Sequence, residues 1–298
     1  MEWRAVALGV AFAAMWSSAF TSARIVVAHA PPFLALSVRF LVSGLLALGI
    51  GWALGQRIRL TRSEWAAVVV FGICQNALYL GLNFEAMRSI DASVAAIVAS
   101  LLPLIVAALG RIVLGERLTA VALAGLVAGF AGVLVIMVER LGHGADVRGL
   151  VLCATGALAL AVATITLRTA SGGGNLWMVV GLQMLVGAVV LFPVALGFET
   201  WRVVWSWWLF WAFLYMVLFP GVIATMIWFV LVRRIGATRA ATFHFLNPFF
   251  GVATAAVILA EPVTLRDVIG VAIIMAGILA VQLARSPTAR IAPRPLTE

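Results

Sequence analysis

Polar side chains that could bind a ligand gather in one apolar stretch, residues 64–86. Gln75, Tyr79 and Asn83 are spaced four residues apart, and Asn76 lies beside the first of them. In a helix this spacing places the three side chains on one face. A single amide in an apolar helix more often joins two helices, but this many polar groups exceed that need. We therefore expect Tyr79 and Asn83 to line a cavity.

A second polar cluster contains His244 and Asn247, three residues apart. Pro248 cannot donate a hydrogen bond to the carbonyl of His244, so the pattern predicts a free carbonyl beside the imidazole. Pro103 frees the carbonyl of Ala99 in the same way. Two helices broken near their middles are typical of a central binding site in a carrier. The alternative is that both prolines only bend their helices.

Two tryptophans, Trp16 and Trp228, lie well inside apolar runs, where they could face either lipid or a substrate. Together with the polar clusters they complete the predicted site. We expect the substrate-binding residues to be Trp16, Asn76, Tyr79, Asn83, Ser100, Trp228, His244 and Asn247, with Pro103 and Pro248 as the helix breaks.

Composition excludes several classes of protein. The chain has 298 residues, of which 64% are hydrophobic and only 10% charged, so it belongs in a bilayer. Its net charge of +9 comes from scattered arginines, which does not predict nucleic-acid binding. The three histidines lie far apart, and both cysteines sit inside apolar runs. We expect no metal site, no cofactor, no disulfide and no enzymatic activity.

The elements that must position these residues are membrane helices. Crossing about 30 Å of hydrocarbon takes about 20 helical residues. The first apolar run is too long for a secretory signal, so we expect it to be retained. The fold class predicted is all-α, with ten transmembrane helices at 5–28, 33–55, 64–86, 92–113, 118–138, 148–168, 175–197, 207–232, 239–260 and 265–284.

An internal repeat organises these helices. Pro103 falls on Pro248, and Gly125 and Gly132 fall on Gly270 and Gly277, always 145 positions apart. The repeat predicts two five-helix halves, 1–140 and 141–285, followed by a disordered cytoplasmic tail, 286–298. An odd number of helices inverts the second half relative to the first. We expect the glycines to give close helix contact.

Arginines in the short loops predict the orientation. With the N-terminus inside, thirteen arginines lie on the cytoplasmic side and six on the other, so both termini are expected in the cytoplasm. Arg39 stands about two turns inside its helix, and we expect it either to extend to the interface or to pair with Glu85. Glu116 and Glu261 are expected to cap the helices that follow them.

Several segments resemble a known family. WSSAFTSAR at 16–24, VRFLVSGLLAL at 38–48, NFEAMRSIDASVAAIVASLLPL at 83–104 and LGERLT at 114–119 are similar to the drug/metabolite transporter superfamily, within it the ten-helix EamA-type exporters. The second copy departs from the pattern, with Ala in place of the Gly before Glu261. The resemblance implies two inverted, EamA-like halves around a central cavity. It also implies export of amino acids, related metabolites or amphipathic drugs, and is nearest to exporters of aromatic or broad amino-acid specificity.

The function predicted is that of a secondary carrier in the bacterial inner membrane, working by alternating access as a monomer on a small-molecule substrate. All eleven acids lie in predicted loops, tails or helix ends, so facilitated transport is favoured over proton antiport. In that alternative, His244 would be the coupling group. A non-transport assembly or lipid-processing protein is the further alternative. A sugar-nucleotide carrier would need basic cavity residues, and only Arg39 qualifies.

Overall fold

The computed structural model describes residues 3–90, 95, 98–115, 118–137, 146–170, 175–251, 253 and 264–284. Throughout these residues the regular structure is helical, with no strand. The elements are α1 (Trp3–His29), α2 (Pro32–Ala53), α3 (Arg62–Phe71), η1 (Gly72–Leu80), α4 (Gly81–Ala86), α6 (Leu102–Leu114), α7 (Ala120–Met137), α8 (Val147–Ala170), α9 (Leu176–Phe198), α10 (Trp207–Met216), η2 (Val217–Ile223), α11 (Ala224–Ile235), α12 (Ala237–Ala241), η3 (Thr242–Leu246) and α14 (Leu265–Leu283).

Six helices in the described part of the chain are long and apolar enough to cross a bilayer. Two of them are composite. The first runs through α3, η1 and α4, and the second runs through α10, η2 and α11. Their middle segments, η1 and η2, are wound as π-helix. Shorter apolar helices occupy 102–113, 120–135 and 268–283.

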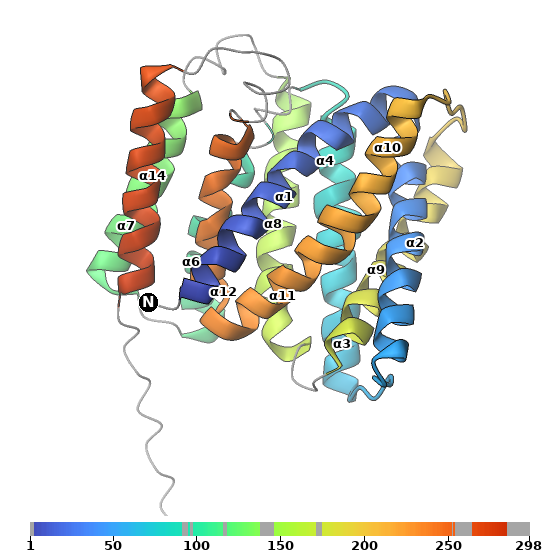
Figure 1. Ribbon diagram of the computed structural model, residues 1–298, viewed down its shortest axis with the longest axis horizontal. Coiled ribbons are helices and arrows are strands. Elements are labelled where there is room, and N and C mark those ends of the chain that lie inside the picture. The colour runs from blue at the N-terminus through green and yellow to red at the C-terminus, as the bar shows by residue number, and fades with distance from the viewer. Residues whose placement is uncertain are drawn as a thin grey trace, which may run out of the picture.

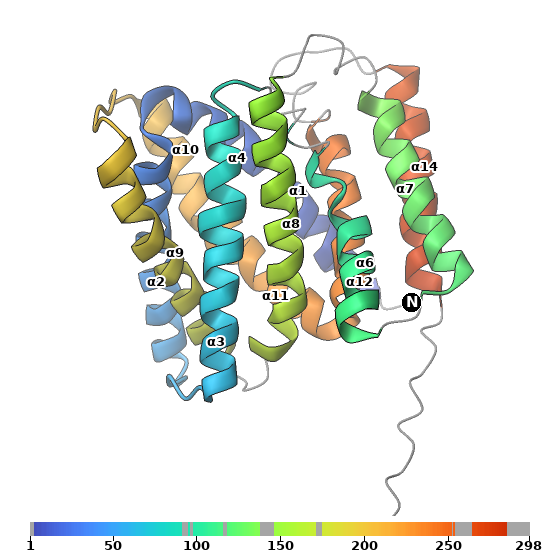
Figure 2. The same cartoon turned by 180° about the vertical axis from the view of Figure 1, so that it is seen from behind.

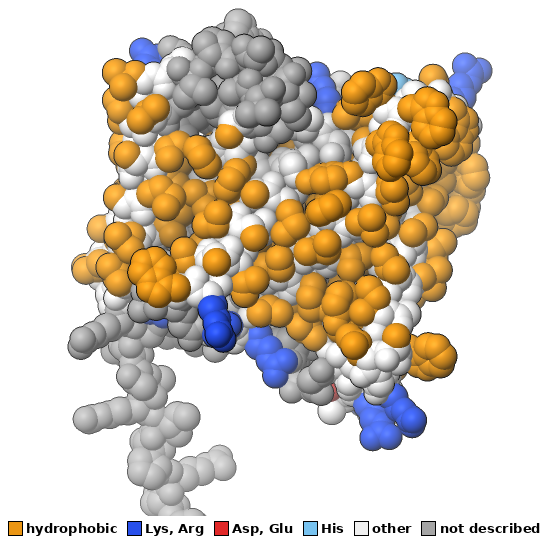
Figure 3. Space-filling view, in the orientation of Figure 1, with side chains coloured by type: hydrophobic (Ala, Val, Ile, Leu, Met, Phe, Trp, Pro, Cys, Tyr) orange, Lys and Arg blue, Asp and Glu red, His pale blue; other side chains and the backbone are white. Residues whose placement is uncertain are grey.

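The outer surface suits lipid. Hydrophobic side chains cover the middle of the face in Figure 3, and arginines lie toward its two ends. A cluster of exposed tryptophans surrounds the start of α10, a position typical of the boundary between membrane and water. Its members are Trp201, Trp205, Trp207, Trp208 and Trp211.

Glycines bring two helix pairs into backbone contact at opposite edges of the molecule. α7 packs on α14 at one edge, and α2 packs on α9 at the other (Figures 1 and 2). A Cβ at Gly125 would lie 2.7 Å from the carbonyl oxygen of Gly277, and one at Gly132 would lie 2.7 Å from that of Gly270. The predicted close packing of these glycines is therefore confirmed.

Between the two edges lie the helices that build the site. α1 and the composite helix from α10 to α11 cross the front in Figure 1, while α8 and the composite helix from α3 to α4 stand behind them. α12 and η3 lie beside α1 and α6. The chain thus brings segments from both ends of the sequence to one centre.

Helix starts follow ordinary capping chemistry. Thr61 and Glu64 form a reciprocal capping box on α3. The Thr119 hydroxyl accepts from the Ala122 N–H at the start of α7. The caps predicted at Glu116 and Glu261, and the predicted disorder of 286–298, lie outside the described residues.

Candidate functional site

A small cavity lies between α1, α2, α10 and the composite helix from α3 to α4. Its lining includes Trp16, Arg39, Tyr79, Asn83 and Met216. It holds about 20 Å³ of water-accessible space, which is room for about one water molecule. The cavity is therefore too small for an organic substrate, which would need the surrounding helices to separate.

A cluster of packed rings extends from the cavity into the molecule. Phe12 is at its centre, with its ring centroid 5.3 Å from Trp16, 4.9 Å from Trp228 and 5.2 Å from His244. Trp228 meets His244 edge to face at 4.9 Å, and Trp16 is stacked parallel to Tyr79 at 6.3 Å. All five rings are buried. We call these five residues the ring cluster; they come from α1, η1, α11 and η3.

Polar atoms within and beside this cluster have no hydrogen-bond partner among the described residues. They are both ring nitrogens of His244, Nε1 of Trp228, and both side-chain amide atoms of Asn247. The His244 ring approaches the Ala241 carbonyl without reaching hydrogen-bond geometry. A buried polar atom without a partner costs about 1–3 kcal/mol. Five such atoms lie close together here.

The π-helical segments both reach the cavity wall. Tyr79 and Leu80 of η1 line the cavity, as does Pro220 of η2. π-helical turns are rare and are frequently found at functional sites. η2 begins 145 positions after η1, the same offset as the sequence repeat. The two local distortions thus occupy equivalent places in the repeated sequence.

A family model describes nearly all of this chain. The model of the EamA-like transporter family matches residues 3–138 and again residues 147–283. The chain belongs to the EamA-like transporter family. The family predicted from the sequence resemblance is confirmed, and the chain is a multi-pass membrane protein of a transporter family.

Similar proteins carry the same general description. An uncharacterized transporter, YvbV of Bacillus subtilis, is 27% identical and covers 89% of this chain and 87% of its own. An uncharacterized transporter of Archaeoglobus fulgidus is also 27% identical, over 93% of this chain and 97% of its own. The aromatic amino acid exporter YddG of Ancylobacter novellus is 32% identical over 38% of this chain and 39% of its own.

A solved crystal structure shares the fold. It superposes with a TM-score of 0.78 at 23% identity, and the match covers 94% of this chain and 96% of that chain. The helical arrangement described above is therefore one that an experimentally determined protein also adopts.

In this EamA-like transporter, the residues predicted on 64–86 separate into two groups. Tyr79 and Asn83 line the cavity. Asn83 is also held in place, because its Nδ2 donates to the Tyr79 carbonyl at 2.8 Å and its Oδ1 accepts from the Cys153 thiol at 3.4 Å. Asn76 lies elsewhere, where its amide donates to the backbone oxygen and the Oε1 of Gln183 on α9. Asn76 therefore joins two helices.

The residues predicted on 239–260 are all buried beside the ring cluster. His244 and Asn247 have no exposed surface, and Ser17 of α1 donates to the Asn247 carbonyl at 2.7 Å. The expected free carbonyl at His244 is wrong, because the Asn247 N–H donates to it. Pro248 has no N–H with which to donate to the His244 carbonyl, as the fourth residue of an α-helix would. In the 3₁₀ turn of η3 the N–H of the third residue, Asn247, donates to that carbonyl instead.

The other predicted positions mark a second interrupted helix. Pro103 is the second residue of α6, which begins after a turn at 100–101. Ser100 is buried in that turn. The sequence left open whether Trp16 and Trp228 face lipid or a substrate. In the structure both are buried members of the ring cluster.

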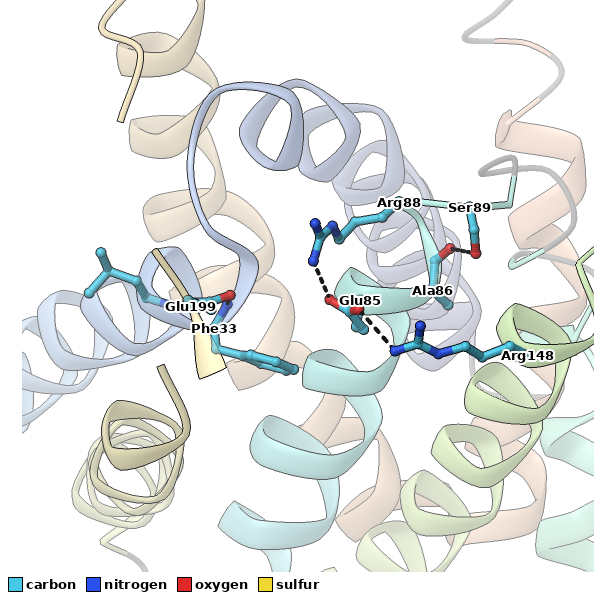
Figure 4. Close-up of polar contacts among 8 residues, drawn as sticks. Phe33, Glu85, Ala86, Arg88, Ser89, Arg148 and Glu199 are labelled. Atoms are coloured by element: carbon cyan, nitrogen blue, oxygen red, sulfur yellow. Dashed lines mark hydrogen bonds and ion pairs between the residues drawn. The ribbon is translucent and has the colours of Figure 1, made fainter. Parts of the chain in front are cut away.

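The predicted pairing of Arg39 with Glu85 is wrong. Glu85 lies instead between two other arginines, with contacts of 3.2 Å to Arg88 and 3.4 Å to Arg148 (Figure 4). Arg39 donates through Nε to the carbonyl of Met216 at 3.1 Å and stays inside the bundle. Arg88 and Arg148 are exposed and pair with Glu85 at the helix end, where forming the ion pair removes less water from the charged groups.

Sequence reasoning missed one member of the ring cluster and one hydrogen bond between α1 and α10. Phe12, at the centre of the ring cluster, precedes Trp16 by four residues, and that helical spacing was the available signal. Tyr215 of α10 shares a 2.5 Å hydrogen bond with the Ser18 hydroxyl of α1. No local sequence signal connects those two residues, which are 197 positions apart.

Proposed function

We propose that this EamA-like transporter is a secondary carrier that exports amino acids and related small amphipathic metabolites from the cytoplasm. The observation that carries the proposal is the ring cluster with its unpartnered polar atoms. Rings offer a flat apolar surface, while an imidazole, an indole N–H and an amide offer hydrogen bonds to a polar head. The partial similarity to an exporter of aromatic amino acids supports the same substrate class.

The proposed architecture is ten helices in two inverted five-helix halves, 1–140 and 141–285. The double match of the family model and the equal spacing of η1 and η2 support two related halves. The arginine distribution supports cytoplasmic termini in a bacterial inner membrane. We propose that one chain suffices for transport, because the cavity and the ring cluster are lined from within a single chain.

Alternating access is the proposed mechanism. The small cavity around Tyr79 and Asn83 and the interrupted helices at Pro103 and Pro248 support it, since many carriers bind and release a substrate at a central site between broken helices. In this scheme the polar atoms of His244 and Asn247 gain partners when substrate enters. The proposed role of the protein is therefore transport and not catalysis.

Facilitated transport is the proposed form of coupling. Among the described residues, no Asp or Glu is fully buried or lines the cavity, and proton-driven carriers commonly keep such a group in the pathway. His244 is the one buried histidine in the described part of the chain, so it is the candidate for the alternative, proton antiport.

Uptake by proteoliposomes tests the function. Purified protein in liposomes is loaded with unlabelled amino acids, and counterflow of labelled tryptophan, phenylalanine, leucine and a hydrophobic cation is measured. Protein-dependent counterflow of the aromatic amino acids is expected. If no amino acid and no cation moves, the carrier function is contradicted and a non-transport role takes its place.

A pH gradient tests the coupling on the same vesicles. Release should proceed at similar rates with and without the gradient. Accumulation against concentration, abolished by His244→Ala while counterflow persists, would establish proton antiport instead.

A further inference from the structure

Arg39 is a buried cation at the wall of the cavity. Only 3% of its surface is exposed, and it is the one arginine among the described residues that is buried. An arginine keeps its charge in nearly any surroundings, and a buried charge without a partner is strongly disfavoured. A guanidinium in this position therefore needs an explanation beyond helix packing.

One edge of this guanidinium has a structural partner. Its Nε donates to the carbonyl of Met216, the residue that precedes η2. Ser43, one turn further along α2, donates to the next carbonyl, that of Val217. The π-helical winding of η2 changes which backbone donors reach these carbonyls, so both side chains support the junction between α10 and η2.

The other edge is free to bind. Nη1 of Arg39 has no hydrogen-bond partner among the described residues. The Arg39 side chain lines the same cavity as Trp16, Tyr79 and Asn83. Its Cζ lies 5.2 Å from the ring of the adjacent Phe40, a contact that supplies no hydrogen bond. The fixed Nε thus orients a guanidinium whose Nη1 has an unmet requirement for an acceptor.

We propose that Arg39 binds the carboxylate of the transported substrate, with the apolar part of that substrate against Trp16 and Tyr79. The assignment rests on the proposed function and names its substrate class as carboxylate-bearing molecules with a flat apolar group. One guanidinium neutralises one carboxylate, and can form two parallel hydrogen bonds with it. A phosphate dianion would leave an excess negative charge among the apolar lining residues Phe20, Phe84 and Met87.

The small cavity keeps Arg39 buried without a counterion, whereas a cavity widened around a bound carboxylate would contain a neutral pair. A carboxylate on the substrate therefore offsets the cost of burying the guanidinium, and a substrate that lacks the carboxylate does not.

Binding of tryptophan and of tryptophan amide to the purified full-length transporter tests the assignment, because the two ligands share the ring and the amine and differ at the carboxylate. The wild type should bind tryptophan about 10- to 100-fold more tightly than the amide, as expected for a hydrogen-bonded charge. In Arg39→Gln that ratio should fall to about one, with affinity for the amide retained. Arg24→Gln is the matched control.

The control removes the same charge outside the cavity. Arg24 is exposed and also donates to a backbone carbonyl, that of Ile90, at 3.1 Å. Its substitution should leave the ratio unchanged. Phenyl phosphate and phenylacetate, used as competitors of tryptophan, separate the two anions, and stronger competition by phenyl phosphate would overturn the choice of carboxylate.

The outcomes separate this assignment from the function on which it rests. Equal affinity of the wild type for tryptophan and its amide, with counterflow of both, overturns the role of Arg39 but not the transport function. This outcome is measured on the wild type, so it does not depend on the folding of a variant. A ratio that survives in Arg39→Gln does the same. Absence of binding and counterflow for both ligands overturns the proposed function and the role of Arg39 together.

Discussion

Two buried polar pairs in this transporter differ in whether their hydrogen bonds are made. Asn76 and Gln183 satisfy each other across η1 and α9, and Gln183 also donates to the Val180 carbonyl. His244 and Asn247 are equally buried, yet none of their side-chain nitrogen or oxygen atoms has a partner among the described residues. Burial alone therefore does not identify a ligand-binding residue. Whether a buried polar side chain has a hydrogen-bond partner distinguishes a residue that joins two helices from a candidate ligand-binding residue.

The largest expected effect follows from breaking the satisfied pair. Asn76→Leu leaves the Oε1 and the backbone oxygen of Gln183 buried without that donor, which should lower the free energy of unfolding by about 1–3 kcal/mol. Thermal unfolding in detergent measures it. The double variant Asn76→Leu/Gln183→Leu should recover part of the loss, because the two side-chain partners are then removed together. An unchanged melting temperature in Asn76→Leu would contradict the view that the Asn76–Gln183 pair stabilises the fold.

Substitution in the unsatisfied pair should have the opposite pattern. His244→Leu removes two unpartnered ring nitrogens from a site with no exposed surface, so the melting temperature should stay the same or rise. Counterflow of tryptophan should fall roughly tenfold, since a hydrogen bond to the substrate is lost. A large drop in melting temperature, with transport lost in proportion to folded protein, would place His244 with Asn76 as a packing residue.

A third polar group extends the comparison to an anion with satisfied hydrogen bonds. The carboxylate of Glu199, which follows α9, accepts from the N–H groups of Phe33 and Leu34 at 2.8 and 2.9 Å and so caps α2 (Figure 4). Glu199→Ala should lower the free energy of unfolding by about 1 kcal/mol. Glu64→Ala, in the exposed cap of α3, is the control for a smaller loss. Equal losses in both variants would show that partial burial adds nothing to the Glu199 cap.

Sequence patterns predicted burial better than they predicted hydrogen-bond partners. Helical spacing placed Tyr79 and Asn83 together, and the structure places both at the cavity. The same spacing could not show that Asn76 meets Gln183, because that partner lies 107 positions away on a helix whose rotation no local pattern fixes. Charge sign likewise allowed Arg39 to pair with Glu85, while Arg88, three residues from Glu85 on the same turn, was the nearer partner.

Hydrogen-bond register was the other feature hidden from the sequence. Apolar length predicted helices over 64–86 and 207–232, because crossing a bilayer requires such runs. It did not predict that their middles are π-helical, since one extra residue per turn changes neither composition nor hydropathy. Pro248 revealed an interruption, but not the 3₁₀ turn that satisfies the carbonyl of His244. The prediction of close helix contact at the repeated glycines was confirmed, because such close backbone contact leaves no room for a larger residue there.

The smallest expected effect concerns Asp146, a satisfied anion outside the membrane-spanning segments. The Ser89 hydroxyl donates to its Oδ2 at 2.9 Å, and the N–H groups of Arg148 and Gly149 donate to its two oxygens. These bonds, that of Ser89 first, lower the pKa of the Asp146 carboxyl in the folded protein. They join the end of α4 to the start of α8.

A lowered pKa fixes the sign of the pH dependence. The folded protein binds the proton of Asp146 less readily than the unfolded chain, whose aspartate has a pKa of about 3.9. The stabilisation is therefore present above about pH 4 and is lost as the pH falls through the lower folded value. Asp146→Asn should melt slightly below the wild type at pH 7, and the two melting temperatures should converge once the pH falls below the lowered pKa of the folded protein. Ser89→Ala, which removes the largest cause of the lowered pKa, should reproduce part of the difference at pH 7 and move the convergence to higher pH. A difference between wild type and Asp146→Asn that is the same at pH 7 and at acid pH would mean that the carboxylate charge does not stabilise the start of α8.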